Sequence, residues 1–221
     1  MNMKKDLKTK IVDTAEQLFN NSNYYAVSIR DIAKEAGVNH STILYYFKNK
    51  ENLYLTILEN YIDKLKNKKG DWIELVINFN EKKYNKQESF KYLCKILEVL
   101  LDNVFSIDLS FKHETIIFKK KLIKLQSVKE LIYKKFEEPI HDGLIKIILN
   151  IIDVKNVDNV KLHFLPSIII GFVWNVVANK DIILRKIKYE NLNDDLKKVI
   201  FSLIVEQTKL ILTTCDKNVE I

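Results

Sequence analysis

The chain has 221 residues, of which 47% are hydrophobic, and it carries a net charge of +7. This length and apolar content can build a sizeable core, which argues against an intrinsically disordered protein. With four glycines and two prolines, the chain is too poor in turn residues for a β-sandwich or barrel, and long segments carry apolar residues at helical spacing. We therefore expect an all-α fold.

The positive charge fits a polyanionic partner, but its distribution weakens that argument. Residues 1–66 hold ten basic and eight acidic side chains, so this region contributes little net charge. The densest basic run lies between Lys119 and Lys135, and we interpret it as a solvated face. A nucleic-acid partner must therefore be argued from a motif.

Two short helical patterns meet at one glycine in the first quarter of the chain. Ser28 can cap the first helix, and Asp31 lies in its first turn, where negative charge is favourable. Gly37 ends this helix because glycine readily adopts the left-handed conformation of a C-terminal cap. Asn39 is expected to accept a backbone hydrogen bond as the N-cap of a second helix over residues 40–47. The pattern predicts a helix-turn-helix.

The second of these helices has a buried and an exposed side. Ile43 and Phe47 lie four residues apart and are expected to face the core. The side chains left nearer the outside are those of His40, Ser41, Thr42, Leu44 and Tyr45. Small hydrogen-bonding groups therefore gather in the first turn, where a recognition helix meets base edges.

These elements resemble the DNA-binding domain of the TetR family of transcriptional regulators. The resemblance runs from Ile11 to about Leu58. It begins with a first helix that carries Ile11, Ala15, Leu18 and Phe19 on one face, followed by the segment SIRDIAKEAGV. A reading helix that ends in YFK comes next, and NKENL then opens a longer helix. It implies that Thr42 and Lys50 contact DNA phosphates. It also implies that Arg30 approaches the DNA from the preceding helix and that His40, Ser41 and Tyr45 face bases. The complete set of expected DNA-binding residues is Arg30, Asn39, His40, Ser41, Thr42, Tyr45, Tyr46 and Lys50.

Two positions depart from the family pattern. Ser41 stands where the family often has glycine, and Leu44 stands where it usually has a phosphate-binding tyrosine. Leucine cannot donate a hydrogen bond. Tyr45 or Tyr46 could supply the hydroxyl instead, and the sequence leaves this choice open.

The rest of the chain reads as longer helices. Residues 49–66 carry one apolar stripe and form a connecting helix, with a break at 66–70. Further helical segments are expected at about 72–79, 88–106, 109–125, 127–152 with a kink at Pro139, 157–179 and 192–214. The fold is thus predicted as a three-helix DNA-binding domain, residues 1–50, joined to a larger helical effector-binding and dimerisation domain, residues 67–221.

The last two segments, 157–179 and 192–214, are notably apolar. In a monomer they would simply be core, with Gly171 allowing a close helix approach. The family resemblance implies instead that they pair with their copies in a four-helix interface. A homodimer of this kind presents two reading helices and selects a palindromic operator in double-stranded DNA.

The middle helices are the candidate sensor for an unknown effector. Aromatic side chains between helices could line a cavity for an apolar or amphipathic small molecule, although for each of them the core is the simpler interpretation. The candidate pocket residues are Phe105, Phe118, Phe136, Phe172 and Trp174. By the resemblance, ligand binding would change the separation of the reading helices and release the operator.

Other functional classes lack sequence support. No P-loop, dinucleotide glycine pattern, nucleophile elbow, paired cysteines or metal-spaced histidines occur, so we expect no enzyme, cofactor or metal site. Cys94 and Cys215 lie far apart, as in a reduced cytoplasmic protein, and the longest apolar patch, 168–177, is too short to span a bilayer. The sequence predicts a DNA-binding repressor released by a small molecule. The alternative is a DNA-binding regulator controlled by a protein partner or without a ligand.

Overall fold

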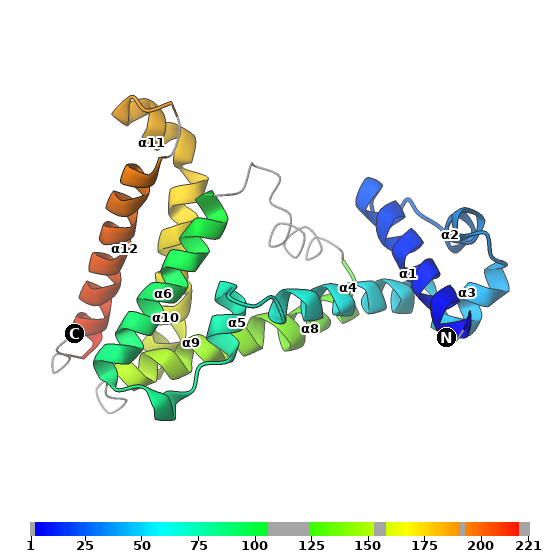
Figure 1. The fold of residues 1–221 in the computed structure, drawn as a ribbon. Coiled ribbons are helices and arrows are strands. Elements are labelled where there is room, and N and C mark those ends of the chain that lie inside the picture. The colour runs from blue at the N-terminus through cyan, green and yellow to red at the C-terminus, as the bar shows by residue number, and fades with distance from the viewer. Residues whose placement is uncertain (1–2, 106–123, 153–157, 191–192, 217–221) are drawn as a thin grey trace. The chain divides into compact units, whose positions relative to one another are not determined.

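The computed structural model describes residues 3–105, 124–152, 158–190 and 193–216, and within these ranges the regular elements are all helices (Figure 1). The expected all-α fold is therefore confirmed for this part of the chain. The described residues divide into two compact units. The first contains residues 3–65 and 124–136, and the second contains 66–105, 137–152, 158–190 and 193–216. The sequence did not predict that 124–136 would group with the amino-terminal helices, and the functional domain limits stay a prediction.

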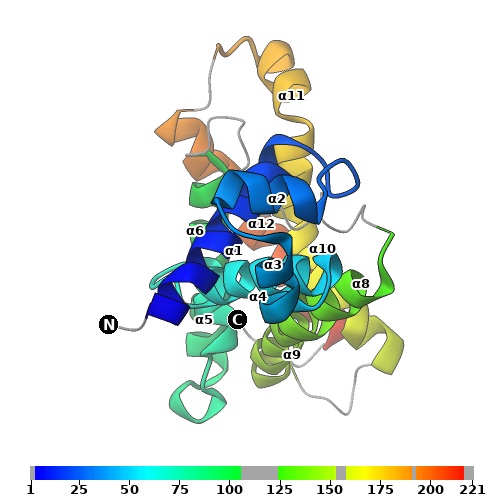
Figure 2. The same cartoon turned by 90° about the vertical axis from the view of Figure 1, so that its right-hand side faces the viewer.

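The first unit is built on the amino-terminal helices. Its elements are α1 (Met3–Asn21), α2 (Ile29–Ala36), α3 (His40–Phe47), α4 (Lys50–Lys66) and α8 (Gln126–Ile132). Helix α2 packs against both α1 and α3, and Figure 2 views the unit from its α2 and α3 side. Apolar side chains from four helices, Ile11, Ala15, Ile32, Ile43 and Leu53, are fully buried. Their burial removes apolar surface from water and fixes the short helices against each other.

Local sequence signals set the limits of α2 as expected. The Ser28 hydroxyl accepts a hydrogen bond from the Asp31 amide at 3.2 Å, and the Asp31 carboxylate accepts one from the Ser28 amide at 2.8 Å. This reciprocal capping box satisfies two amides at the start of the helix. At the other end Gly37 has φ 64° and ψ 38°, the left-handed conformation predicted for it.

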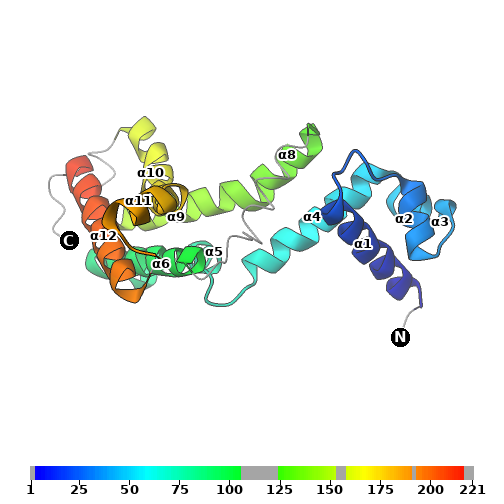
Figure 3. The ribbon, with the colours of Figure 1, turned by 90° about the horizontal axis from the view of Figure 1, so that it is seen from above.

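Helix α8 lies alongside α4 in the first unit (Figure 3). The Ser127 hydroxyl donates to Glu51 at 2.5 Å, and the Lys135 ammonium pairs with Glu59 at 2.6 Å. Both pairs join residues 76 apart in sequence, so the two segments run in the same direction and in register. Val128 and Ile132 are fully buried, which explains why this segment belongs to the first unit.

The second unit surrounds α9. Its elements are α5 (Trp72–Ile77), η1 (Glu81–Lys83), α6 (Lys86–Phe105), α9 (Glu138–Ile151), α10 (Asn159–Ala178), α11 (Lys180–Ile187) and α12 (Asp194–Cys215). Helix α9 contacts α5, α6 and α10, and α6, α10 and α12 lie side by side (Figure 1). A Cβ atom at Gly143 would lie 2.7 Å from the Val76 backbone oxygen. Glycine at this position therefore permits the close approach of α5 and α9.

Two segments differ from the sequence prediction, and a third lies mostly outside the described residues. The expected kink at Pro139 takes the form of a π-helical turn, η2 (Tyr133–Glu137), followed by α9 with the proline in its first turn. Proline lacks an amide hydrogen and its ring crowds the carbonyl four residues earlier, so the preceding turn widens. Helix α11 was not predicted, because its eight residues lie in a polar stretch between two long apolar segments. The predicted segment 109–125 falls almost entirely outside the described residues.

The close helix approach expected at Gly171 is not made by any described helix of the chain itself, and an approach by a second copy stays a prediction. A Cβ atom added there would have no other atom within 4 Å. Within the described ranges, no single helix has the length and hydropathy needed to cross a bilayer, and only the pair α10 and α11, bent by 57°, passes that test jointly.

Candidate nucleic-acid interface

Helix α3 separates a buried side from an exposed side. Ile43 is 0% and Phe47 is 4% exposed, which confirms that these two side chains face the core. Around the opposite side, Ser41, Leu44, Tyr45 and Lys48 are all exposed. Ser41, Leu44 and Tyr45 are spaced i, i+3 and i+4, so they share one side of the helix, and Lys48 follows at its carboxyl end. We call these four residues the α3 outer face.

The N-cap of α3 differs from the expectation. Asn39 occupies the N-cap position, but its side chain makes no capping hydrogen bond, so the predicted side-chain cap is wrong. Backbone contacts close the turn instead, because the Thr42 amide donates to the Asn39 carbonyl and the Val38 amide donates to the Ala33 carbonyl, each at 2.9 Å. The exposed Asn39 amide is therefore not needed to start the helix.

Lys50, at the start of α4, makes its contacts inside the first unit. Its ammonium group donates to the backbone oxygen of Tyr24 at 2.8 Å and to that of Val27 at 2.9 Å. It also lies 4.2 Å from the centroid of the Tyr24 ring, within the range of a cation–π interaction. Two of its three N–H groups are thereby used, and one is left for a phosphate oxygen. The phosphate contact of Lys50 stays a prediction, and a second role for this side chain was missed by sequence reasoning.

An aromatic cluster supports this arrangement. The Tyr54 ring lies 5.2 Å from Phe19 and 4.9 Å from Tyr24, measured between centroids, with edge-to-face orientation. Desolvation lowers the pKa of Lys50, and desolvation together with the nearby Glu51 carboxylate raises the pKa of Tyr24. The cluster thus fixes the loop between α1 and α2, which leads into the helix carrying Arg30.

The remaining predicted contact residues divide by exposure. Tyr45 is 75% exposed, whereas Tyr46 is half-buried, with its ring 6.3 Å from Phe47. Tyr45 is therefore the better placed of the two tyrosines to donate a hydroxyl to DNA. Of the other predicted residues, Arg30, His40 and Ser41 are exposed and Thr42 is half-buried.

Lys48 is a candidate that sequence reasoning omitted. It forms the C-cap of α3 with φ 66° and is exposed. Its place directly after the last residue of the predicted helix, beside Tyr45 and Tyr46, could have revealed it.

The comparison with known families bears directly on this helix-turn-helix. Residues 11–57 match the family described as bacterial regulatory proteins, tetR family. The matched stretch begins in α1, includes all of α2 and α3, and ends within α4. Residues 11–57 of the chain thus resemble the DNA-binding segment of the TetR family.

Curated relatives match this chain over part of their length. The transcriptional activator DhaS of the dhaKLM operon of Lactococcus lactis is 32% identical over 118 residues, 51% of this chain and 57% of its own. The probable transcriptional regulator YttP of Bacillus subtilis is 39% identical over 61 residues, 28% of this chain and 30% of its own. The chain thus spans little more than half of the first relative and less than a third of the second.

Solved structures extend the likeness in fold to nearly the whole chain. The flavonoid-responsive regulator FrrA has a TM-score of 0.64 at 15% identity and covers 97% of this chain and 99% of its own. A TetR-family regulator from Mesorhizobium loti has a TM-score of 0.54 at 13% identity. The match covers 97% of this chain and 98% of that structure's chain. At this identity the likeness concerns the fold alone.

The predicted pocket residues fall in two units or outside the described side chains. Phe118 lies outside the described residues, as does the side chain of Phe105. Phe136 is half-buried in the first unit, whereas Phe172 and Trp174 are half-buried on α10 in the second. A shared effector cavity therefore stays a prediction.

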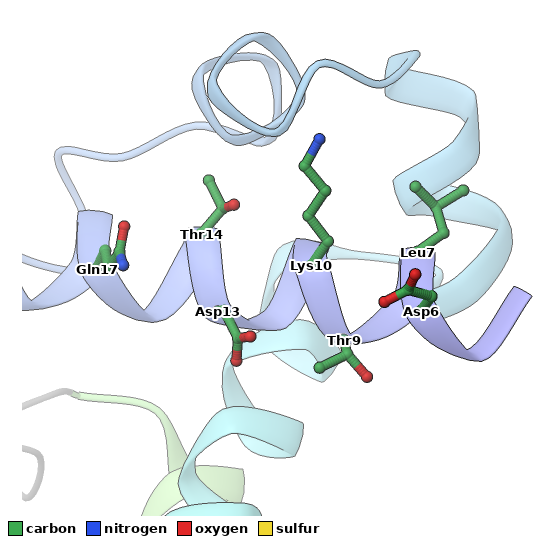
Figure 4. Close-up of a pocket in the computed structure, with 7 residues that line it drawn as sticks. All are labelled: Asp6, Leu7, Thr9, Lys10, Asp13, Thr14 and Gln17. Atoms are coloured by element: carbon green, nitrogen blue, oxygen red, sulfur yellow. The ribbon is translucent and has the colours of Figure 1, made fainter. Parts of the chain in front are cut away.

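A pocket of about 400 Å³ lies along α1 (Figure 4). One helix supplies its whole lining, and six of the seven lining residues have polar side chains: Asp6, Leu7, Thr9, Lys10, Asp13, Thr14 and Gln17. Such a surface hollow differs from the enclosed apolar cavity expected for an effector. Within the described residues, no group of three or more His, Cys, Asp or Glu side chains could hold a metal ion.

Two helices of the second unit expose large apolar side chains. On α10, Val160, Phe164 and Ile168 are 63%, 61% and 43% exposed. On α12, Val199, Leu203 and Leu210 are 56%, 53% and 57% exposed. Spacings of four residues on α10, and of four and seven residues on α12, place each set along one side of its helix, and the two helices are in contact. We call these six residues the α10–α12 apolar surface.

Proposed function

We propose that this chain is a sequence-specific DNA-binding transcriptional regulator of the TetR family. The observation that carries the proposal is the α3 outer face, which presents hydroxyl and ammonium groups on a helix whose other side is fixed in the core by Ile43 and Phe47. A short helix held in this way can place its first turn against base edges in the major groove. The exposed Arg30, on the preceding helix, adds a side chain suited to two-point recognition of guanine.

In this proposal the regulator acts as a homodimer through α10 and α12. An exposed apolar surface of six large side chains favours association, because pairing with a second copy removes it from water. A twofold axis then relates two α3 helices, and the DNA target is a palindrome with half-sites set by their separation. Its place of action would be the cytoplasm, where its DNA partner lies.

We further propose that an apolar or amphipathic small molecule releases the DNA. Support comes from the half-buried aromatic side chains of α10, Phe172 and Trp174, and from the size of the second unit. The alternative, control by a protein partner or by no ligand, keeps the same DNA-binding surface. The relatives include an activator, DhaS, and a negative regulator, IcaR of Staphylococcus epidermidis. The sign of regulation depends on where the operator lies relative to the promoter.

Selection of bound duplexes from a random DNA library tests DNA recognition. The full chain should enrich an inverted-repeat sequence, and its affinity should fall steeply as salt rises. Tyr45→Ala should lower the affinity for the enriched duplex at least tenfold. The matched control is Tyr189→Ala, a tyrosine that is 49% exposed in the second unit, and it should not change this affinity. If the full chain enriches no sequence, the proposal of sequence-specific DNA binding is wrong.

Release by an effector needs a separate experiment. A panel of apolar and amphipathic compounds is first screened for those that raise the thermal midpoint of the purified protein, since a ligand that binds the folded state stabilises it. Each compound that does so should then weaken binding to the selected duplex. If stabilising compounds leave DNA affinity unchanged, the small-molecule mechanism is wrong and the alternative stands.

A further inference from the structure

The α3 outer face contains one apolar side chain. Leu44 is 36% exposed and lies between Ser41, three residues before it, and Lys48, four residues after it. Tyr45, beside it, is 75% exposed. Leu44 therefore interrupts a surface otherwise made of groups that can form hydrogen bonds.

An isolated exposed leucine needs no explanation on an ordinary protein surface. The α3 outer face is different under the proposed function, because it enters a groove of the DNA and loses its water. A leucine has neither donor nor acceptor. If it covered a phosphate oxygen or a polar base edge, it would desolvate that group without replacing the lost hydrogen bonds, which is unfavourable.

The major groove offers one apolar group, the C5-methyl of thymine. Contact with this methyl removes apolar surface of both partners from water and leaves no polar group unpaired. We propose that Leu44 is a specificity-determining residue that contacts the 5-methyl group of one thymine in each half-site. This inference rests on the proposed function, and it assigns a base to a position that the family usually gives to a phosphate contact.

The test removes the methyl group without changing base pairing. After selection of a bound duplex with the full chain, each thymine of a half-site is replaced in turn by deoxyuridine, and the dissociation constant is measured at fixed salt. One thymine should show a loss of about fourfold per half-site, the value that follows from burying a single carbon group. The other thymines should show no comparable loss.

Variants of the protein assign the effect to Leu44. In Leu44→Ala the deoxyuridine substitution at that thymine should no longer change the affinity. Leu44→Asn, which keeps the approximate size and replaces apolar by polar surface, should abolish the effect as well and serves if the alanine variant does not fold. Ser41→Ala, which shortens a neighbouring side chain on the same face, should retain it. Circular dichroism and thermal midpoints check that each variant is folded.

Two results would overturn the inference. A wild-type protein that selects a sequence but tolerates deoxyuridine at every position makes no methyl contact. An effect of the same size in the wild type and in both Leu44 variants assigns the contact to another side chain. Either result leaves DNA recognition intact, whereas the absence of any selected sequence removes the proposed function itself.

Discussion

The ammonium group of Lys50 donates a hydrogen bond to the backbone oxygen of Tyr24 at 2.8 Å and lies 4.2 Å from the centroid of the same residue's ring. A second hydrogen bond, to the oxygen of Val27 at 2.9 Å, closes the loop onto α4. One side chain thereby joins the start of α4 to the residue that directly precedes the N-cap of α2. The two helices that flank α3 in sequence are held together by this contact.

Lys50→Met tests this role, since methionine keeps much of the side chain and removes the ammonium. Two carbonyl groups lose their donor, so we expect a loss of about 1–2 kcal/mol in the free energy of unfolding. Denaturant titration measures the loss. Lys48→Met, which removes an exposed ammonium from the α3 outer face, is the control and should leave stability unchanged. Equal stability of both variants would contradict the structural role of Lys50.

The salt dependence of DNA binding separates the two possible roles of Lys50. A phosphate contact through its remaining N–H would reduce the slope of log affinity against log salt by about 0.9 in the Lys50→Met variant. We expect that reduction together with weaker binding to all sequences. An unchanged slope would limit Lys50 to holding the loop.

Arg30 should control sequence preference. In Arg30→Ala, discrimination at one base pair should fall by about 1–3 kcal/mol, the value of a bidentate base contact. Selection of bound duplexes with each variant measures the change in preference. The chain's other arginine, Arg185, is exposed on α11, and Arg185→Ala should select the same sequence as the wild type. An unaltered preference in Arg30→Ala would exclude it as a base contact.

The capping box of α2 should make the first unit sensitive to acid. Hydrogen bonds from the Ser28 side chain and backbone lower the pKa of Asp31. A carboxylate whose pKa is lower in the folded state stabilises that state above its ordinary pKa and loses this effect as pH falls through its folded-state pKa. The thermal midpoint should therefore decrease as the pH is lowered beneath about 4. This decrease should be smaller in Asp31→Asn than in the control Glu35→Gln, which replaces an exposed carboxylate of the same helix. Identical pH profiles of the two variants would contradict this expectation.

Two glycines in helices of the second unit should respond oppositely to alanine. Gly143→Ala places a methyl group 2.7 Å from the backbone oxygen of Val76, and we expect it to destabilise the fold by about 1–3 kcal/mol because α5 or α9 must shift. Gly171→Ala meets open space within the chain and should be neutral or stabilise by up to about 1 kcal/mol through helix propensity. Chemical denaturation compares them. A neutral Gly143→Ala would show that the two helices are not tightly packed.

The α10–α12 apolar surface should govern self-association. In Phe164→Glu, dimerisation would bury an unpaired carboxylate in the interface, which is unfavourable. Sedimentation velocity should therefore show a monomer at concentrations where the wild type is dimeric. The control is Ile182→Glu, at a residue that is 63% exposed on α11 and outside this surface; it should remain dimeric. A dimeric Phe164→Glu variant would place the interface elsewhere.

Local signals in the sequence were sufficient for the helix-turn-helix. The capping box of Ser28 and Asp31, the left-handed Gly37 and the burial of Ile43 and Phe47 depend on residues within four positions of one another. Such interactions follow from helix geometry and side-chain chemistry alone. The one local error was the Asn39 cap, where backbone hydrogen bonds closed the turn without its side chain.

The tertiary structure decided the contacts between residues far apart in the chain. Lys50 meets carbonyl groups 23 and 26 residues earlier, and Ser127 meets Glu51 across 76 residues. Periodicity states which side of a helix is apolar, but it does not state which other helix covers that side. The sequence by itself determined helix α3 and its exposed residues, because these depend on local spacing and not on distant contacts. The fold alone showed that a lysine expected at a phosphate also holds a loop, and that residues 124–136 pack with the amino-terminal helices.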